Sequence, residues 1–228
     1  MKVLGIDTAL GACSVAIWDG VVIASDHKIM ARGHVEKLIP MAEAVIAQSP
    51  VEFDDLDLIS VSIGPGSFTG IRAGLAAAKG FGLGLNIPVH GVTTLEAVAY
   101  AACKARSSAA PLPIVVALET KRSDFYVQRF DQSGLAINRP AIGLTEEIVS
   151  ELRKEEVCLC GDGAPRVLAS FDELQSSLIE NLEQVQQPSA GDIAEIAANR
   201  YDNPISAEPL YIHPPAAKLP QSKGKLRP

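Results

Sequence analysis

The chain contains an internal repeat, and this repeat constrains the fold more than any other feature. Residues 3–19 align with residues 115–131 without a gap, so that Asp7 falls on Glu119 and Thr8 on Thr120. In both copies an apolar run leads to the acid and the threonine, and a turn and a second apolar run follow. This pattern is typical of a β-hairpin. Its repetition predicts two similar structural units.

Strand and helix patterns alternate after each hairpin. In the first unit they predict strands at 21–29, 58–63 and 87–90, and helices at 34–48, 69–85 and 94–104. In the second unit they predict strands before and after 121–124, near 136–142 and at 157–160, and helices at 145–154 and 192–200. The order is βββαβαβα in both units, with shorter helices in the second. Two such units in succession predict an α/β protein with the duplicated ribonuclease H-like fold, also called the actin-like ATPase or ASKHA fold, in which the second half is degenerate.

The composition indicates where the two halves meet. Residues 105–113 are rich in serine and proline, which is typical of a linker. We expect an N-terminal ribonuclease H-like half at 1–104 and a smaller C-terminal half at 114–215. The end of the chain, 216–228, is polar and basic, and we expect a disordered tail. A solubilising role is favoured over a contact with RNA for its lysines and arginine.

The charge and the cysteines limit the classes of function. The formal net charge is -7 and the sequence pI is about 5.1, whereas autonomous binding to nucleic acid needs a basic face. The four cysteines have apolar neighbours, and Cys158 and Cys160 are spaced to lie on one face of a strand. We expect buried, reduced thiols in a cytoplasmic protein, with neither a signal peptide nor a membrane span.

Proteins of this fold class bind ATP in the cleft between the halves, where the two acid-tipped hairpins hold phosphate and metal. A phosphate-binding turn needs glycines, but the turns here, 8–11 and 120–123, are poor in glycine. Asp7 and Glu119 could hold a hydrated Mg²⁺ or could cap neighbouring amides, and we favour capping. The turn at 161–163 could contact adenosine or be a plain strand-to-helix turn. The candidate nucleotide-binding residues are Asp7, Thr8, Glu119, Gly161 and Gly163, and we expect weak ATP or ADP binding at most and no other cofactor.

A strand, a tight turn and a helix N-terminus are compressed into residues 62–72. Two glycines and a proline allow the turn, and Ser67 or Thr69 can cap the helix. Such a turn can lie against an anion or against another backbone segment. The residues alone favour neither arrangement.

The helix expected at 69–85 carries two stripes of small residues at i, i+4 spacing. The stripes are Gly70, Gly74 and Ala78, and Ala76, Gly80 and Gly84. An interior glycine costs about 1 kcal/mol of helix stability relative to alanine, and a helix that covers a sheet needs only one apolar face. We therefore expect one stripe to pack on the sheet and the other to stay open for a second helix. Burial of both stripes within the chain is the alternative.

Residues 1–104 contain several distinctive motifs: Val3-Leu4-Gly5-Ile6-Asp7-Thr8, Ala78-Lys79-Gly80 and the segments 32–40, 62–74 and 88–96. In these motifs the sequence resembles the TsaB (YeaZ) family of bacterial proteins. Beyond residue 104 only the Glu119 hairpin, the 161–163 turn and the segment 208–211 agree. His213 stands where the family usually has an arginine.

The resemblance implies a partner subunit and not an enzyme. The family is paralogous to TsaD, which transfers a threonylcarbamoyl group to the adenosine next to the tRNA anticodon. Family members pair with TsaD, and the ATPase TsaE joins the complex. They form a homodimer when TsaD is absent. The resemblance thus implies that the chain reaches tRNA only through the complex. The two metal-binding histidines of TsaD correspond to Thr94 and Val98 here. Because neither side chain can replace an imidazole, we expect no metal and no catalytic residue.

The resemblance also places the partner surface on the helices at 34–48 and 69–85. The residues expected there are His34, Leu38, Met41, Gly70, Arg72, Ala73, Ala76, Lys79 and Gly80. Two other functions are weighed against this one. An ATP-dependent enzyme of the actin and sugar-kinase class would need the missing glycine-rich hairpins. A glycoprotease-like hydrolase would need a metal pair or a nucleophile with its base, and the sequence offers neither.

Overall fold

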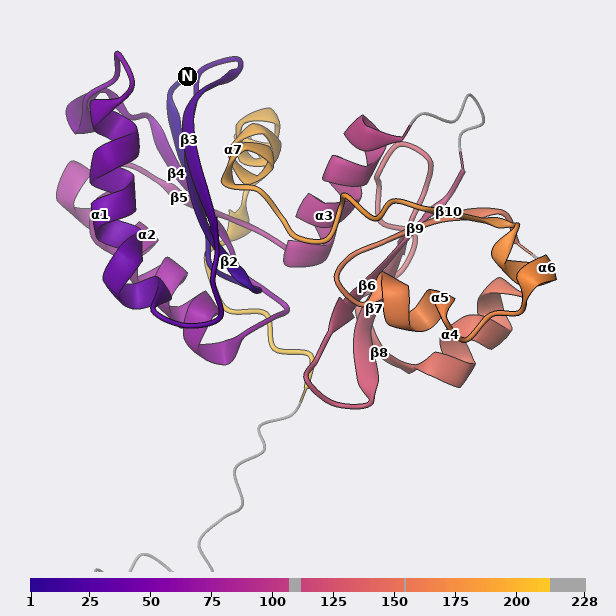
Figure 1. Ribbon diagram of the computed structural model, residues 1–228. Helices are drawn as coiled ribbons and strands as arrows, with labels where there is room; N and C mark the ends of the chain where they lie inside the picture. Colours follow the sequence, from indigo (N-terminus) through magenta and orange to yellow (C-terminus); the bar gives the residue numbers. More distant parts are fainter. Residues whose placement is uncertain (107–111, 154, 214–228) are drawn as a thin grey trace, which may run out of the picture.

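The fold consists of two β-sheets, each covered by helices (Figure 1). The computed structural model describes residues 1–106, 112–153 and 155–213. The linker expected at 105–113 lies largely outside the described residues, and the tail expected at 216–228 lies wholly outside them. The first sheet has six strands in the order β11-β5-β4-β1-β2-β3, and the second has five in the order β10-β9-β6-β7-β8.

The same strand arrangement opens both sheets. In the first, β1 is antiparallel to β2 and parallel to β4, and in the second β6 is antiparallel to β7 and parallel to β9. The strands of the first sheet are β1 (Val3–Asp7), β2 (Ala12–Trp18), β3 (Val22–Ile29), β4 (Leu58–Ser62), β5 (Val89–Val92) and β11 (Ile205–Ser206). Those of the second sheet are β6 (Ile114–Glu119), β7 (Asp124–Phe130), β8 (Ala141–Leu144), β9 (Val157–Cys160) and β10 (Ile179–Asn181). The duplicated fold predicted from the repeat is thereby confirmed.

The helices divide between the two sheets. They are α1 (His34–Ala47), α2 (Phe68–Leu85), α3 (Thr94–Ala105), α4 (Thr145–Leu152), α5 (Ala164–Leu168), α6 (Glu173–Ser176) and α7 (Ala190–Asn199), with a short 3-10 helix at Phe53–Asp55. Helices α1 and α2 lie side by side on the outer face of the first sheet, and α7 covers its other face (Figure 1). Helix α3 packs against β6, β7 and β9 of the second sheet.

The position of α7 differs from the division of the chain expected from sequence. That division assigned all of 114–215 to the second half, whereas α7 packs on β1, β2 and β4, and β11 pairs with β5. Gly5 allows this contact, because a Cβ atom built there would lie 2.1 Å from the carbonyl oxygen of Ala190. The Ala190 amide donates to Ser14 Oγ at 3.1 Å. The apolar pattern of α7 indicates that it needs a face to cover, but not which sheet supplies it.

Two strands also shift along the sequence. Strand β5 begins at Val89 and not at residue 87, and β8 occupies Ala141–Leu144 and not 136–142. Ala136 forms only an isolated bridge with Phe130. Both shifts leave the order of elements along the chain unchanged, and β5 pairs with β4 and β11 while β8 pairs with β7.

Three of the four cysteines are buried as expected, namely Cys13, Cys158 and Cys160, whereas Cys103 is only half-buried. Cys158 and Cys160 face the main core, whereas Val157 and Leu159 on the same strand face the smaller core of the second half. Burial raises the pKa of Cys158 to about 12 and that of Cys13 to about 11, so both are neutral thiols. Among the described residues, no helix combines the length and the apolar character needed to cross a bilayer.

Candidate functional site

The turn between β4 and α2 packs against the first hairpin. Ser67 caps α2 by accepting a hydrogen bond from the Gly70 amide at 3.3 Å, and its own amide donates to the Ala9 carbonyl at 2.7 Å. Gly64 has a φ of 103°, a conformation that favours glycine. The turn therefore lies against another backbone segment, which is one of the two arrangements that the sequence left open, and the Ser67 amide is already used.

The acid of the first hairpin is buried and serves the chain itself. Asp7 is fully buried, and one of its carboxylate oxygens accepts from the Ala9 amide at 3.1 Å. Burial raises its pKa to about 6. The Thr8 hydroxyl donates to the Gly70 carbonyl at 2.7 Å. Thr8 thus holds the hairpin to α2, whereas Asp7 caps an amide of the hairpin turn, in keeping with the capping role favoured for it from the sequence.

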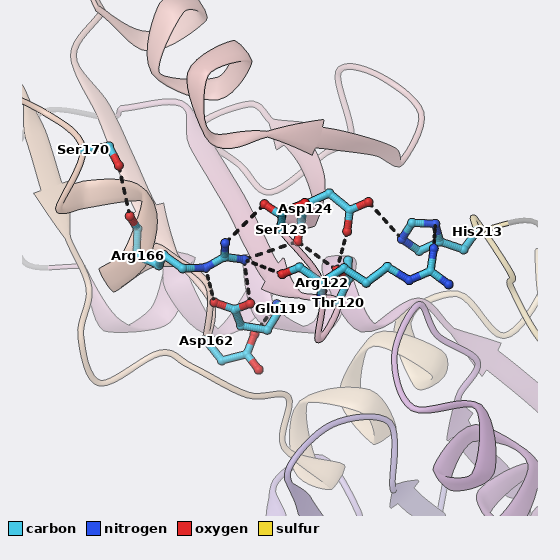
Figure 2. Close-up of polar contacts among 9 residues, drawn as sticks. All are labelled: Glu119, Thr120, Arg122, Ser123, Asp124, Asp162, Arg166, Ser170 and His213. Atoms are coloured by element: carbon cyan, nitrogen blue, oxygen red, sulfur yellow. Dashed lines mark hydrogen bonds and ion pairs between the residues drawn. The ribbon is translucent and has the colours of Figure 1, made fainter. Parts of the chain in front are cut away.

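The acid of the second hairpin is paired with an arginine (Figure 2). Arg166 on α5 donates to both carboxylate oxygens of Glu119, through Nε at 2.9 Å and Nη2 at 2.8 Å. Asp162 accepts from the Glu119 amide at 2.9 Å, and burial raises its pKa to about 6. No local sequence pattern pointed to Arg166, because it reaches Glu119 from 47 positions further along the chain.

The two glycines of the 161–163 turn face the second sheet. The Gly161 amide donates to the Val185 carbonyl at 2.8 Å, and the Gly163 amide donates to the Ala117 carbonyl at 3.0 Å. A Cβ atom built on Gly161 would lie 2.2 Å from the Ala117 oxygen. Both amides are therefore used within the chain, and close packing explains the two glycines. Contact of this turn with a nucleotide stays a prediction.

A cleft of about 550 Å³ lies between the hairpins and the starts of α1 and α2. Of the residues singled out from sequence, it brings together His34, Gly70 and Glu119, whereas Asp7, Thr8, Gly161 and Gly163 do not line it. It adds Arg32, Lys121 and Asp162, which were not assigned to a site. Lys121 has a φ of 65°, unusual for a non-glycine residue. The cleft thus mixes both signs of charge.

One stripe of small residues on α2 is buried and the other is exposed, as expected from the sequence. Gly70, Gly74 and Ala78 are buried, while Ala76, Gly80 and Gly84 are exposed. A Cβ atom on Gly70 would lie 2.0 Å from the Thr8 carbonyl oxygen, but no described atom lies within 4 Å of one built on Gly80. One stripe therefore packs on the sheet and the other is open.

Three of the residues expected at a partner surface are buried within the chain. Leu38 and Met41 lie on the side of α1 that faces the sheet, and Gly70 packs against Thr8, so the expectation for these three is wrong. Val35 and Ile39 are the large apolar residues that α1 exposes instead. His34 and Ala73 are half-buried, and Arg72, Ala76, Lys79 and Gly80 are exposed as expected.

An exposed aromatic cluster lies at the start of α2. The Arg72 guanidinium is 3.9 Å from the centre of the Phe68 ring, and its Nε donates to the Tyr211 hydroxyl at 2.9 Å. The Phe68 and Tyr211 rings stack at 5.5 Å. Sequence reasoning missed this cluster because Tyr211 comes from the far end of the chain.

The C-terminal segment continues from Tyr211 to the second hairpin. His213 Nε2 lies 3.4 Å from Asp124 Oδ2, and the imidazole packs on the edge of Tyr126. The last described residue of the chain therefore contacts the second half. Thr94 and Val98 are both fully buried in α3. Within the described part of the chain, no group of three or more His, Cys, Asp or Glu side chains is placed to hold a metal ion.

Two matching sheets, each with an acid at the end of its first strand, define a protein of the duplicated ribonuclease H-like class. The solved structure of YeaZ from Pseudomonas aeruginosa has this fold: it superposes with a TM-score of 0.79 at 23% identity, over 92% of this chain and 99% of that one. The family model of TsaD, tRNA N6-adenosine threonylcarbamoyltransferase, matches residues 22–150.

Sequence relatives agree with this match. The tRNA threonylcarbamoyladenosine biosynthesis protein TsaB of Escherichia coli is 29% identical over 96% of this chain and 99% of its own length. Protein Rv3421c of Mycobacterium tuberculosis is 32% identical over 95% of this chain and 93% of its own. The chain belongs to the TsaD family, as a member of its TsaB (YeaZ) group, which confirms the resemblance seen in the sequence.

Proposed function

We propose that the chain is a non-catalytic partner subunit in the biosynthesis of threonylcarbamoyladenosine in tRNA, and that it binds TsaD and, with it, TsaE. The observation that carries this proposal is the open stripe of α2, formed by Ala76, Gly80 and Gly84. The names of the TsaB relatives supply the pathway. In the absence of TsaD the same surface would pair two copies of the chain.

The open stripe has a cost that the isolated chain does not recover. Each interior glycine lowers helix stability by about 1 kcal/mol relative to alanine. No described atom lies within 4 Å of a Cβ atom built on Gly80 or Gly84, so packing inside the chain does not require glycine at either position. A second helix that approaches closely does require small residues there. The stripe is therefore accounted for by a partner.

The surroundings of the stripe suit a protein interface. Leu83 on α2 is 86% exposed and Val35 on the neighbouring α1 is 61% exposed. The Phe68, Arg72 and Tyr211 cluster adds two aromatic rings and an arginine, residue types that dominate binding energy at interfaces. Exposed large apolar side chains close to a smooth helix face are expected where a partner covers them.

The cleft supports a subunit without its own chemistry. Thr8 holds the first hairpin to α2, Asp7 accepts from the Ala9 amide, and Glu119 is paired with Arg166. The Gly161 and Gly163 amides donate to carbonyl oxygens within the chain. These contacts leave few free amides for phosphate, which supports weak ATP or ADP binding and argues against the kinase-like alternative. The net charge of -7 supports contact with tRNA only through the complex.

Reconstitution tests the proposal directly. Purified TsaD, TsaE and the threonylcarbamoyl-adenylate synthase are combined with substrate tRNA, with and without this chain, and the modified adenosine is quantified. We expect modification to depend on the chain and to proceed at the wild-type rate with the Asp162→Asn variant, which alters a cleft acid. Modification that does not need the chain would contradict the partner role. Loss of modification with Asp162→Asn, at unchanged TsaD binding, would contradict the non-catalytic role.

A further inference from the structure

The guanidinium of Arg166 lies in a cage of oxygen atoms (Figure 2). Besides the two carboxylate oxygens of Glu119, it contacts three carbonyl oxygens of the turn between β6 and β7. Nη1 is 3.2 Å from the Ser123 carbonyl, and Nη2 is 3.5 Å and 3.4 Å from those of Arg122 and Asp124. The Phe125 ring covers the guanidinium, and the centre of the ring lies 3.8 Å from Arg166 Cζ. A set made only of carboxylate and carbonyl oxygens is the set that hard divalent cations prefer.

We propose that Arg166 is a built-in cation that replaces the divalent metal ion at the acid of the second hairpin. Proteins of this fold class place Mg²⁺ and nucleotide phosphates at this point. In this chain the cage is already filled by a side chain that cannot dissociate and that stays charged at any physiological pH. The inference does not depend on the partner role.

The residues present do not fit a divalent ion in addition to Arg166. Both carboxylate oxygens of Glu119 are committed to one guanidinium, with good geometry for a paired contact. A second cation in the cage would stand within a few ångströms of the first, and their repulsion would weaken its binding. Two other acids lie near the guanidinium, and both carboxylates already have partners: Asp162 accepts from the Glu119 amide, and the Asp124 carboxylate contacts the Thr120 hydroxyl and the His213 imidazole.

The arrangement also explains how the hairpin keeps its shape. Arg166 joins α5 to the Glu119 side chain and to the three consecutive carbonyls of residues 122–124. The Thr120 hydroxyl holds the same loop from within, because it donates to the Asp124 carbonyl at 2.8 Å. In a metal-dependent protein the ion would do this only when bound. Here the loop is held permanently, and its order should not respond to Mg²⁺ or to a chelator.

Removal of the guanidinium should therefore expose a latent metal site. In the Arg166→Gln variant the Glu119 carboxylate and the turn carbonyls lose their cation, and Mn²⁺ or Mg²⁺ can take its place. The matched control is Arg129→Gln, which removes another arginine from the same half, one that pairs with Glu155 outside the cleft. The double variant Glu119→Gln with Arg166→Gln removes both the cation and its main ligand.

The test is the binding of Mn²⁺ to the full chain, measured by electron paramagnetic resonance, together with thermal melts in MgCl₂ and in chelator. We expect Arg166→Gln to bind Mn²⁺ at least about tenfold more tightly than wild type or Arg129→Gln, and to gain thermal stability with Mg²⁺. The double variant should lose that binding. The melting temperature of wild type should be the same with Mg²⁺ and with chelator.

Two results would overturn the proposal. One is stoichiometric Mn²⁺ binding by wild type that Glu119→Gln abolishes, because metal and Arg166 would then share the cage. The other is a folded Arg166→Gln variant that binds Mn²⁺ no better than Arg129→Gln. If Arg166→Gln does not fold, the wild-type measurement and Arg166→Lys decide, since the lysine keeps a positive charge in the cage and should still exclude Mn²⁺.

Discussion

Alanine at Gly74 and alanine at Gly80 should have opposite effects on stability, although the two glycines lie less than two turns apart on α2. Both substitutions remove the conformational freedom that glycine has in the unfolded chain, which stabilises a helix by about 0.5 to 1 kcal/mol. At Gly80 nothing offsets this gain, because no described atom lies within 4 Å of the new Cβ atom. We therefore expect Gly80→Ala to be stabilising.

At Gly74 the new methyl group meets the first hairpin. Its Cβ atom would lie 2.5 Å from Thr8 Oγ1 and 3.4 Å from Val61 Cγ2. The hydroxyl cannot move away freely, because it donates to the Gly70 carbonyl at 2.7 Å. Overpacking of this kind costs about 1 to 3 kcal/mol, which exceeds the helical gain. Gly74→Ala should thus be destabilising by about 1 to 2 kcal/mol.

Urea denaturation followed by far-ultraviolet circular dichroism measures both effects. For a chain of this size, 1 kcal/mol corresponds to a shift of about 2 to 4 °C in melting temperature, so thermal melts resolve the difference as well. The same two variants can be titrated with TsaD, where Gly80→Ala should weaken binding while it raises stability. Equal signs of the stability change at the two positions would refute the assignment of one buried and one open stripe.

Three further predictions follow from the described contacts. Burial raises the pKa of Asp162 from its ordinary value of 3.8 to about 6, so the folded chain loses about 3 kcal/mol of stability as the pH rises through that window. The Asp162→Asn variant keeps the accepting oxygen but cannot titrate, so it should flatten the fall in melting temperature between about pH 4 and pH 7. An unchanged fall would contradict this. Ser67→Ala should destabilise the chain by about 1 kcal/mol through loss of the α2 cap, as measured by urea denaturation, with Thr69→Ala as the control that leaves stability within error. Burial raises the pKa of Cys160, so this thiol should react with a thiol reagent only at the rate of unfolding. Rapid labelling of the folded chain would contradict this and show that the core opens locally.

The sequence predicted the fold well because the signals that specify it are local. Apolar periodicity located α1, α2 and the paired hairpins, and the repeat of Asp7 at Glu119 indicated the duplication. The same local rules narrowed the cap of α2 to Ser67 or Thr69, and the structure shows that it is Ser67. The placement of α7 escaped prediction, because amphipathic spacing shows that a helix has an apolar face but does not identify the sheet that it covers.

The site was harder to predict because its contacts join distant parts of the chain. Arg166 reaches Glu119 across 47 positions and Tyr211 reaches Arg72 across 139 positions, and no spacing rule connects such pairs. Leu38 and Met41 were expected at the surface on resemblance alone, although their helical spacing with the other buried residues of α1 marks them as core. Periodicity is the better guide where it disagrees with resemblance about burial.

The affinity of the Ala76→Arg variant for purified TsaD tests the central claim most directly. Ala76 is the first residue of the open stripe and is exposed near the middle of α2, so an arginine there should leave the fold intact and block close approach of a second helix. Leu174→Arg is the matched control, because it places the same side chain on an exposed apolar position of the second half. We expect Ala76→Arg to weaken TsaD binding by at least about a hundredfold at an unchanged melting temperature, while Leu174→Arg binds like wild type. Normal binding of TsaD by a folded Ala76→Arg variant would contradict the account.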